Sequence, residues 1–198
     1  MRVLVACEYS GRVREAFRAL GHDAWSCDLI EAEDDHTHHL IADAVTLAYS
    51  GHWDLLVAHP PCTYLCRAGW RWNNAPDQYA PKPLHGAPRR QAVVAARDFF
   101  MLLLHAPIKR AAIENPRPAP GAGLPEATQY IQPWQFGHGE VKATGLWLRN
   151  LPALVPTDIV EGREAVVHRM SPGPLRWKER SRTYTGIASA MAAQWGNV

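Results

Sequence analysis

The chain alternates short apolar runs with longer segments in which apolar residues recur at helical spacing. The runs RVLVAC (2–7), WDLLVAH (53–59) and RAAIEN (110–115) have the length of buried strands, and HDAWSCDL predicts another strand that ends at Asp28. Each run is bounded by polar residues, glycine or proline, which are typical of turns. These four segments therefore predict the strands of one sheet.

The segments between these runs predict helices. GRVREAFRALG (11–21) has apolar residues at helical spacing, and Gly21 suits a C-terminal cap. ADAVTLAYS (42–50) predicts a short helix, and RRQAVVAARDFFMLLLHA (89–106) predicts a long one. Strands separated by helices indicate an α/β fold with a mostly parallel sheet and helices on both faces.

Reactive and polar residues follow the carboxyl ends of the predicted strands. They are Cys7-Glu8, Asp28, Pro60-Pro61-Cys62 and Glu114-Asn115. Sheets of this class bind ligands beyond the carboxyl ends of their strands. The sequence therefore predicts a functional site at this edge of the sheet.

Composition narrows the class of protein. The 198 residues are 47% hydrophobic and 20% charged, which is typical of one globular domain spanning 1–198. The apolar runs are shorter than a membrane helix requires, and the N-terminus lacks the layout of a signal peptide. We therefore expect a cytoplasmic protein without a membrane partner, whose four cysteines are reduced. The net charge of +2 is compatible with nucleic acid but too small to argue for it.

HPPCTYL (59–65) followed by IENP (113–116) resembles the SAM-dependent DNA (cytosine-5) methyltransferase family, whose signatures are a Pro-Cys loop and a Glu-Asn pair in that order. VLVACEYSGRVREAF lies where that family has its first loop for S-adenosylmethionine (SAM). FGHGEVKATGLWL (136–148) resembles its Gln-x-Arg-x-Arg hairpin, and GIASAMAAQWGNV resembles its closing helix. The resemblance covers most of the chain and implies the SAM-methyltransferase (Rossmann-like) fold.

The resemblance implies covalent catalysis. The Cys62 thiolate would add to C6 of cytosine, so that C5 could attack the methyl group of SAM. Because a free thiol has a pKa near 8.5, local depression of that pKa would help. Glu114, protonated or sharing a proton, would hold N3 and the 4-amino group of the base, and Asn115 would position Glu114.

The resemblance also implies a SAM site. Asp28 would bind the ribose, and Asp43 in ADAVTL would lie at the adenine. The helix that begins at Gly11 is expected to offer free N–H groups to the methionine carboxylate, with Glu8 as a candidate for its amino end. The complete set of expected SAM-binding residues is Cys7, Glu8, Tyr9, Ser10, Gly11, Asp28, Asp43 and Pro60.

The expected substrate is DNA or a cytosine nucleotide. A loop at about 60–88 would face it, and the family's recognition domain is reduced to a basic segment at about 150–185, so we expect low sequence specificity. In the hairpin, Glu140, Lys142 and Thr144 stand where Gln, Arg and Arg are expected. The expected substrate-binding residues are Pro61, Trp70, Arg71, Trp72, Lys142, Thr144, Arg176, Lys178, Arg180 and Arg182. Trp70 and Trp72 would either stack on a base or pack their own loop down.

Several alternatives remain open on sequence grounds. The same chemistry could act on a free deoxycytidine nucleotide or on single-stranded nucleic acid, or the chain could be a non-catalytic binder that retains the fold. An amino-group methyltransferase is a further alternative, because that class carries Asp/Asn-Pro-Pro-Tyr where this chain has His-Pro-Pro-Cys. His59 lacks the carboxyl or amide of that motif and Glu114-Asn115 would have no role, so the cytosine-5 interpretation is favoured. Cys7, Cys27 and Cys66 are expected to be structural. DDHTHH (34–39) is expected to be a solvated loop away from the strand ends rather than a metal site, and no metal is expected.

Overall fold

A seven-stranded sheet lies at the centre of the computed structural model, which describes residues 1–79, 83–171 and 173–198. The strand order is β3-β2-β1-β4-β5-β7-β6. The first five strands of this order are parallel, and β7 runs antiparallel to both β5 and β6. The strands are β1 (Arg2–Ala6), β2 (Asp23–Asp28), β3 (His39–Ile41), β4 (Leu55–Ala58), β5 (Arg110–Pro116), β6 (Gln129–Ile131) and β7 (Thr144–Arg149). The predicted α/β class with a mostly parallel sheet is confirmed.

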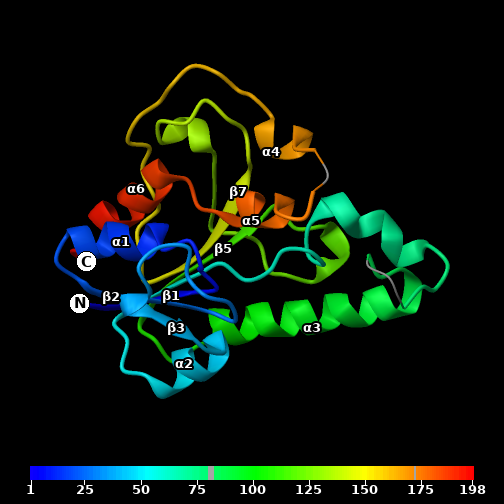
Figure 1. The fold of residues 1–198 in the computed structure, drawn as a ribbon, viewed down its shortest axis with the longest axis horizontal. Helices are drawn as coiled ribbons and strands as arrows, with labels where there is room; N and C mark the ends of the chain where they lie inside the picture. Colours follow the sequence, from blue (N-terminus) through cyan, green and yellow to red (C-terminus); the bar gives the residue numbers. More distant parts are fainter. Residues whose placement is uncertain (80–82, 172) are drawn as a thin grey trace.

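Helices cover both faces of the sheet (Figure 1). The α-helices are α1 (Arg12–Ala19), α2 (Ala44–Ser50), α3 (Gly86–Leu104), α4 (Val166–Arg169), α5 (Arg176–Ser181) and α6 (Thr185–Trp195). Helices α1 and α6 pack together on one face, and α2 and α3 lie on the other. Single 3₁₀ segments occupy His36–His38, Arg67–Asn74, Pro120–Ala122 and Pro133–Gln135. No helix within the described ranges has both the length and the apolar character needed to cross a bilayer.

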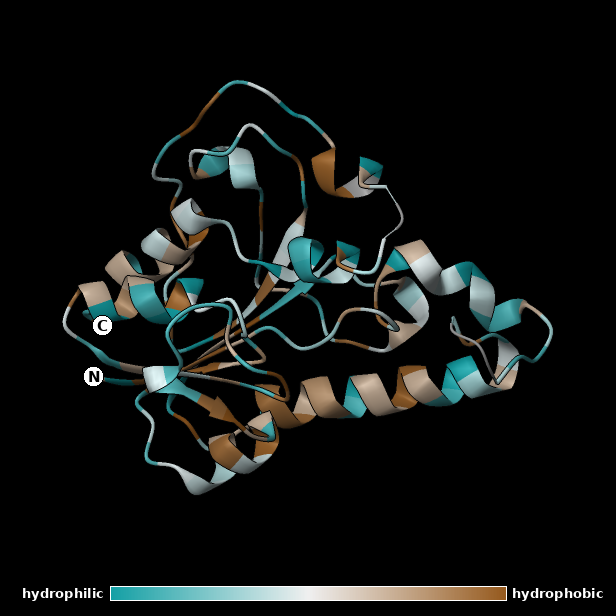
Figure 2. Cartoon of the chain, viewed as in Figure 1, coloured by the Kyte–Doolittle hydropathy of each residue, from teal (hydrophilic) through white to brown (hydrophobic). Residues whose placement is uncertain are grey.

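The strands are apolar on both sides because each side meets a helical layer. In β1 and β4, Val3 and Val57 point into the core with α1 and α6, whereas Leu4 and Leu56 point into the core with α2 and α3. All four side chains are fully buried, and burial of each stabilises the fold by about 1.5–3 kcal/mol. Figure 2 shows the central strands, and the end of α3 beside them, in the colours of hydrophobic residues.

The connections reverse direction between β1 and β4, and this reversal positions the candidate site. From β1 the chain continues to β2 on one side, whereas β4 and β5 lie on the other. Ala6 and Ala58 are direct neighbours at the ends of β1 and β4. A crevice beyond the carboxyl ends of the strands at such a reversal is the usual ligand site of this fold class.

The predicted elements agree with the structure apart from their ends. The long helix begins at Gly86 rather than at residue 89, and Gly21 follows α1 with a positive φ of 82°, as its predicted capping role requires. The predicted hairpin at 136–148 contributes β7, which pairs with β6, and the predicted closing helix is α6. The expected substrate loop (60–88) contains residues 80–82, and the expected recognition segment (150–185) contains residue 172, which lie outside the described residues.

Candidate functional site

The ends of β4 and β5 bring two predicted motifs together. Asn115 is buried, and its Nδ2 donates a hydrogen bond to the carbonyl oxygen of Pro60 at 2.9 Å. The sequence led us to expect that Asn115 positions Glu114, but in the structure it fixes the Pro-Cys loop. Neighbouring residues of a strand point to opposite faces, so Asn115 and Glu114 do not share a side of the sheet. The contact ties the Glu-Asn pair to the backbone that carries Cys62.

Glu114 pairs with His59, a residue that the sequence did not indicate. Oε2 of Glu114 lies 3.3 Å from Nδ1 of His59, and the two side chains are only 17% and 7% exposed. Burial alone would raise the pKa of Glu114. The hydrogen bond and charge of His59, together with the charge of Lys142, outweigh burial and lower that pKa. Glu114 is therefore an ionised carboxylate that shares a hydrogen bond with an imidazole.

Cys62 and Cys66 form a pair of thiols on one backbone turn. The N–H groups of Leu65 and Cys66 donate to the carbonyl oxygen of Cys62 at 3.0 and 3.1 Å, so the two side chains lie one turn apart. A hydrogen bond with Cys66, followed by burial, raises the pKa of Cys62 well above the ordinary cysteine value. The hydrogen bond from Cys62 lowers the pKa of Cys66 to about 6 despite burial, and N–H groups of Ala68 and Gly69 support its thiolate.

This pair corrects two expectations from the sequence. The expected depression of a thiol pKa falls on Cys66 rather than on Cys62. The side chain of Cys66 also contacts the candidate nucleophile, Cys62, so we count Cys66 as part of the candidate site and not only as a structural residue. Cys27 is buried and Cys7 is half-buried, and burial raises the pKa of each thiol.

The start of α1 already holds a carboxylate of the protein itself. Glu8 is buried, and its Oε1 and Oε2 accept hydrogen bonds from the backbone N–H groups of Val13 (2.7 Å) and Arg14 (3.2 Å). Cys7 adopts a left-handed conformation with φ 58°, directly before Glu8 turns towards the helix. The expectation that α1 offers free N–H groups at this point to a methionine carboxylate is therefore wrong.

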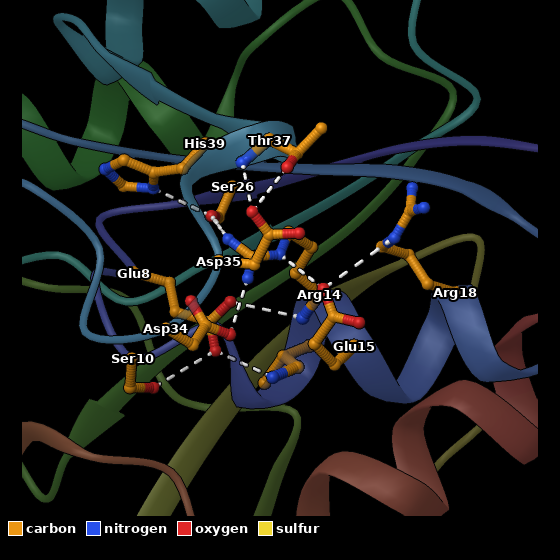
Figure 3. A network of polar contacts seen from close by, with 11 residues as sticks. Glu8, Ser10, Arg14, Glu15, Arg18, Ser26, Asp34, Asp35, Thr37 and His39 are labelled. Carbon is orange, nitrogen blue, oxygen red and sulfur yellow. Dashed lines mark hydrogen bonds and ion pairs between the residues drawn. The ribbon is translucent and has the colours of Figure 1, made fainter.

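A buried arginine connects this first loop to β2 and to the segment after β2 (Figure 3). The Arg14 side chain is fully buried, and its nitrogens contact Ser26 (2.9 Å), Asp34 (2.6 Å) and Glu15 (2.8 Å). Gly11 is required here, because its φ is +70° and a Cβ atom would collide with Asp34 and Arg14. The network fixes the loop at the end of β1.

Asp28 and Asp43 lie at the end of the sheet where β2 and β3 finish. The N–H of Ala42 donates to the carbonyl oxygen of Asp28 at 3.0 Å, which brings the two acidic residues into the same region. The Asp43 side chain caps α2 by accepting a hydrogen bond from the backbone N–H of Thr46. Asp28 is partly buried, and burial raises the pKa of its carboxyl group. A shallow depression of about 490 Å³ lies next to Asp28. It is lined by Leu29, Ile30, Glu31, Ala32, Glu33, Ile41, Trp177 and Lys178.

The segment around α5 crosses over the first loop, and we call residues 176–183 the strap. The Tyr9 hydroxyl donates to the carbonyl oxygen of Lys178, and Arg12 donates to the carbonyl oxygen of Thr183 at 2.8 Å. Arg182 forms two hydrogen bonds of 2.8 Å with the carboxylate of Glu33. The expected basic segment is thus fastened across the end of β1.

A second pocket lies between the strap, α4 and the loop before β7, with a volume of about 270 Å³. Four basic and two acidic side chains line it, together with Tyr184 and apolar residues of α4. The charged residues are Arg12, Lys142, Arg180, Arg182, Glu140 and Glu179. Neither Cys62 nor Glu114 lines this pocket, but the charge of Lys142 acts on both: it helps to lower the pKa of Glu114 and opposes part of the rise in the pKa of Cys62. Lys142 therefore links the pocket electrostatically to the candidate catalytic pair.

The structure separates the expected substrate-binding residues into groups. Lys142, Arg180 and Arg182 line the second pocket, whereas Lys178 lines the depression beside Asp28. Thr144 is buried, and its hydroxyl donates to the carbonyl oxygen of Lys142. Pro61 is exposed beside Cys62.

The tryptophans of the segment Arg67–Asn74 pack against other parts of the protein. Trp70 packs against the core beneath α3, and Trp72 stacks on His85 with ring centroids 4.4 Å apart. Arg71 lies over the ring of Trp72 at 4.7 Å. Of the two roles considered for Trp70 and Trp72, stacking on a base or packing their own loop, the contacts in this structure are those of packing.

The segment at 34–39 lies nearer the strand ends than expected. The N–H of Glu33 donates to the carbonyl oxygen of Tyr9 at 2.8 Å, and Asp34 binds Arg14. His39 contacts Ser26 and the carbonyl oxygen of Ile30 (Figure 3 shows the Ser26 contact). Within the described ranges, no group of three or more His, Cys, Asp or Glu residues could hold a metal ion.

His59 and Cys66 are the functional candidates that the sequence reasoning missed. The parallel register pairs Ala58 with Ile113, so the next residues, His59 and Glu114, follow side by side. A signal for His59 was therefore present in the spacing of the two strand ends. For Cys66, the signal was its position four residues after Cys62, which is one helical turn.

No protein-family model and no curated protein matches this chain. Among solved structures, a similar chain is a protein encoded within a prophage of E. coli and provisionally named a DNA modification methyltransferase. The two share 12% identity and superpose with a TM-score of 0.47, over 81% of this chain and 52% of the other. The present chain therefore spans about half the length of that protein.

Proposed function

We propose that this protein transfers a methyl group from SAM to C5 of cytosine in DNA, through a covalent bond between Cys62 and C6 of the base. The observation that supports this most is the arrangement at the ends of β4 and β5. The Cys62–Cys66 thiol pair and the His59–Glu114 pair follow adjacent parallel strands, and Asn115 ties the two together. A nucleophile on one side and a group for N3 on the other are what addition to a pyrimidine ring requires.

In the proposed reaction, the Cys62 sulfur bonds to C6 while its proton passes to the Cys66 thiolate. Cys66 suits this role because its pKa of about 6 leaves it ionised at neutral pH and in contact with the Cys62 thiol. The electron pair of the C5–C6 double bond shifts towards C5 and N3, where Glu114 holds the ring. SAM supplies the electrophilic methyl group when it is bound. The C5 proton leaves afterwards to solvent, and Cys62 is released.

The proposed cofactor site fits the nucleoside end of SAM. The depression has apolar walls from Leu29, Ile41 and Trp177, which suit an adenine ring. Asp28 directly precedes Leu29 in the chain, and in the proposal its carboxylate binds the ribose hydroxyls at the edge of this depression. The methionine carboxylate cannot use the N–H groups of Val13 and Arg14, because Glu8 occupies them. The proposed SAM binding therefore depends on the nucleoside more than on the amino acid.

The proposed DNA contacts are phosphate contacts of the basic side chains in the strap and at Lys142. The segment at about 150–185 is short for a recognition domain, so low sequence specificity is part of the proposal. The alternative substrates are a free deoxycytidine nucleotide and single-stranded nucleic acid, which need no recognition domain.

A trapping experiment tests the proposal. The purified protein is incubated with SAM and with 5-fluorocytosine in duplex DNA, in single-stranded DNA or in a nucleotide, and covalent adducts are measured by mass spectrometry. We expect an adduct at Cys62, because fluorine cannot leave C5 as a proton does. Cys62→Ala should abolish it, whereas Cys27→Ala, a matched change of a buried thiol, should not. An adduct of equal yield in Cys62→Ala would refute the assignment.

The substrate that gives the adduct decides between the alternatives. Reaction with duplex DNA should weaken as salt rises, with the slope of log affinity against log salt falling by about one for each phosphate contact removed. A free nucleotide would show a much shallower response. Sequencing of methylated random DNA measures specificity, and strict modification of one motif of four or more base pairs would contradict the expected low specificity.

A further inference from the structure

His59 lies beside Glu114 for a reason that the strand register makes explicit. Ala58 of β4 is paired with Ile113 of β5, so His59 and Glu114 occupy the next lateral position. Alternation places both on the side of the sheet that carries Val57 and Ala112. The backbone N–H of His59 donates to the carbonyl oxygen of Ala6 at 2.9 Å, which holds the residue at the end of β1 as well.

The imidazole is buried between charged groups from three segments. Glu114 of β5 contacts its Nδ1, and the charge of His59 also acts on Glu8 in the loop after β1. Lys142, in the loop before β7, acts on Glu114. Among the described residues, Nε2 of His59 is buried without a hydrogen-bond partner. A buried histidine with one orphaned nitrogen and two nearby carboxylates is costly as mere packing, because unpaired polar atoms lose their hydration.

We propose that His59, acting through Glu114, supplies the proton that Glu114 delivers to N3 of the cytosine ring. The inference rests on the proposed function. As the Cys62 sulfur bonds to C6, the electron pair displaced from the ring is matched by a proton at N3. Nδ1 of His59 passes its proton to the carboxylate of Glu114, which passes it on to N3, so that the imidazolium becomes neutral imidazole and Glu114 ends as a carboxylate again. Loss of the C5 proton and release of Cys62 reverse the transfer, and the proton returns through Glu114 to His59.

This role resolves a conflict within the site. The chemistry needs a proton at Glu114, yet the surroundings lower its pKa and keep it ionised. A carboxylate hydrogen-bonded to a protonated imidazole can pass a proton without being protonated at rest. His59 therefore allows Glu114 to stay charged in a buried position and still act as a donor.

His59→Asn separates proton supply from simple positioning. The Nδ2 group of asparagine can replace the Nδ1–H donor of histidine, but it cannot carry a transferable proton at neutral pH. A structural hydrogen bond would survive this change, whereas a proton supply would not. His52→Asn is the matched control, because His52 is exposed and precedes β4 at its amino end, whereas His59 follows the carboxyl end of the same strand.

The first measurement needs no activity. Carbon-13 NMR of carboxyl-labelled glutamate, with Glu114 assigned through Glu114→Gln, follows the titration of Glu114. We expect His59→Asn to raise the pKa of Glu114, because burial is then no longer offset by the charge of His59. His52→Asn should leave it unchanged. An unchanged pKa of Glu114 in His59→Asn would overturn the proposal.

The second measurement is methyl transfer. We expect His59→Asn to lower kcat by a factor on the order of 10² with little change in the KM for SAM, and to alter the pH profile of kcat. Circular dichroism and thermal unfolding check that the variant folds. A folded His59→Asn with wild-type kcat and pH profile would overturn the inference. If the wild-type protein methylates none of the substrates, the proposed function fails, and the Glu114 titration still reports whether the two residues are coupled.

Discussion

Replacing Cys66 with serine is expected to remove the thiolate that the protein carries at neutral pH. A thiol with a pKa of about 6 is about 90% ionised at pH 7, whereas one at the ordinary value of about 8.5 is about 3% ionised. Burial raises the pKa of Cys7 and of Cys27, so these thiols stay protonated. The wild-type chain should therefore carry about 0.9 thiolate at pH 7, and Cys66→Ser should carry less than about 0.05.

Ultraviolet absorbance of the thiolate near 240 nm, followed from pH 4 to pH 9, measures this directly. Absorbance is preferable to alkylation rates, because a thiolate of low pKa is also less nucleophilic, which offsets much of its greater abundance. Cys62→Ala should move the midpoint upwards rather than abolish it, since Cys66 loses its first stabilising contact but keeps the N–H groups of Ala68 and Gly69. A wild-type protein without a thiolate below pH 8, or a Cys66→Ser protein that keeps one, would refute this account of the pair.

Asp28→Ala is expected to weaken SAM binding, measured by calorimetry. In the same assay, 5′-methylthioadenosine should bind nearly as well as S-adenosylhomocysteine, because Glu8 occupies the N–H groups that an amino-acid carboxylate would use. A 100-fold preference for S-adenosylhomocysteine would contradict this. Arg182→Ala should change the unfolding free energy by less than about 1 kcal/mol, since the ion pair of Arg182 with Glu33 is partly exposed. The same change should weaken the binding of DNA of any sequence in fluorescence anisotropy, and an unaltered affinity would exclude Arg182 from the interface. Arg14→Met should destabilise the protein by about 1–3 kcal/mol in urea unfolding through lost charged hydrogen bonds; a stability equal to wild type would contradict that role. Because the pKa of Glu114 is lowered in the folded protein, its ionisation contributes stability that is present above the unfolded pKa of about 4.3 and is lost as pH falls through the folded pKa. Glu114→Gln should therefore reduce the loss of melting temperature at acidic pH, and an unchanged dependence of melting temperature on pH would contradict this.

The strands and helices could be predicted because their patterns are periodic and local. β1 and β4 are apolar on both sides, and α3 is long, so each was recognisable without its neighbours. β3 and β6 were not predicted, because three-residue strands depend on pairing with β2 and β7 rather than on their own sequence.

The candidate site was predictable only in part, because side-chain partners depend on lateral neighbours. The motifs indicated Cys62 and Glu114, and the structure brings them to adjacent strand ends. The sequence did not show that Asn115 would bind Pro60, since that contact depends on which face of β5 it occupies. Nor did it show that Glu8 would cap α1, since the left-handed turn at Cys7 redirects the chain just before it.

The carboxylate of Glu8 at the start of α1 has a consequence for how the protein reaches its folded state. A helix that begins at a ligand site usually leaves N–H groups that only the ligand satisfies, so the empty protein carries an energetic burden. Here the chain supplies the anion itself, and Arg14 fastens the surrounding loop. These N–H groups at the start of α1 are therefore satisfied by the chain itself, and this part of the fold does not need a bound cofactor to form.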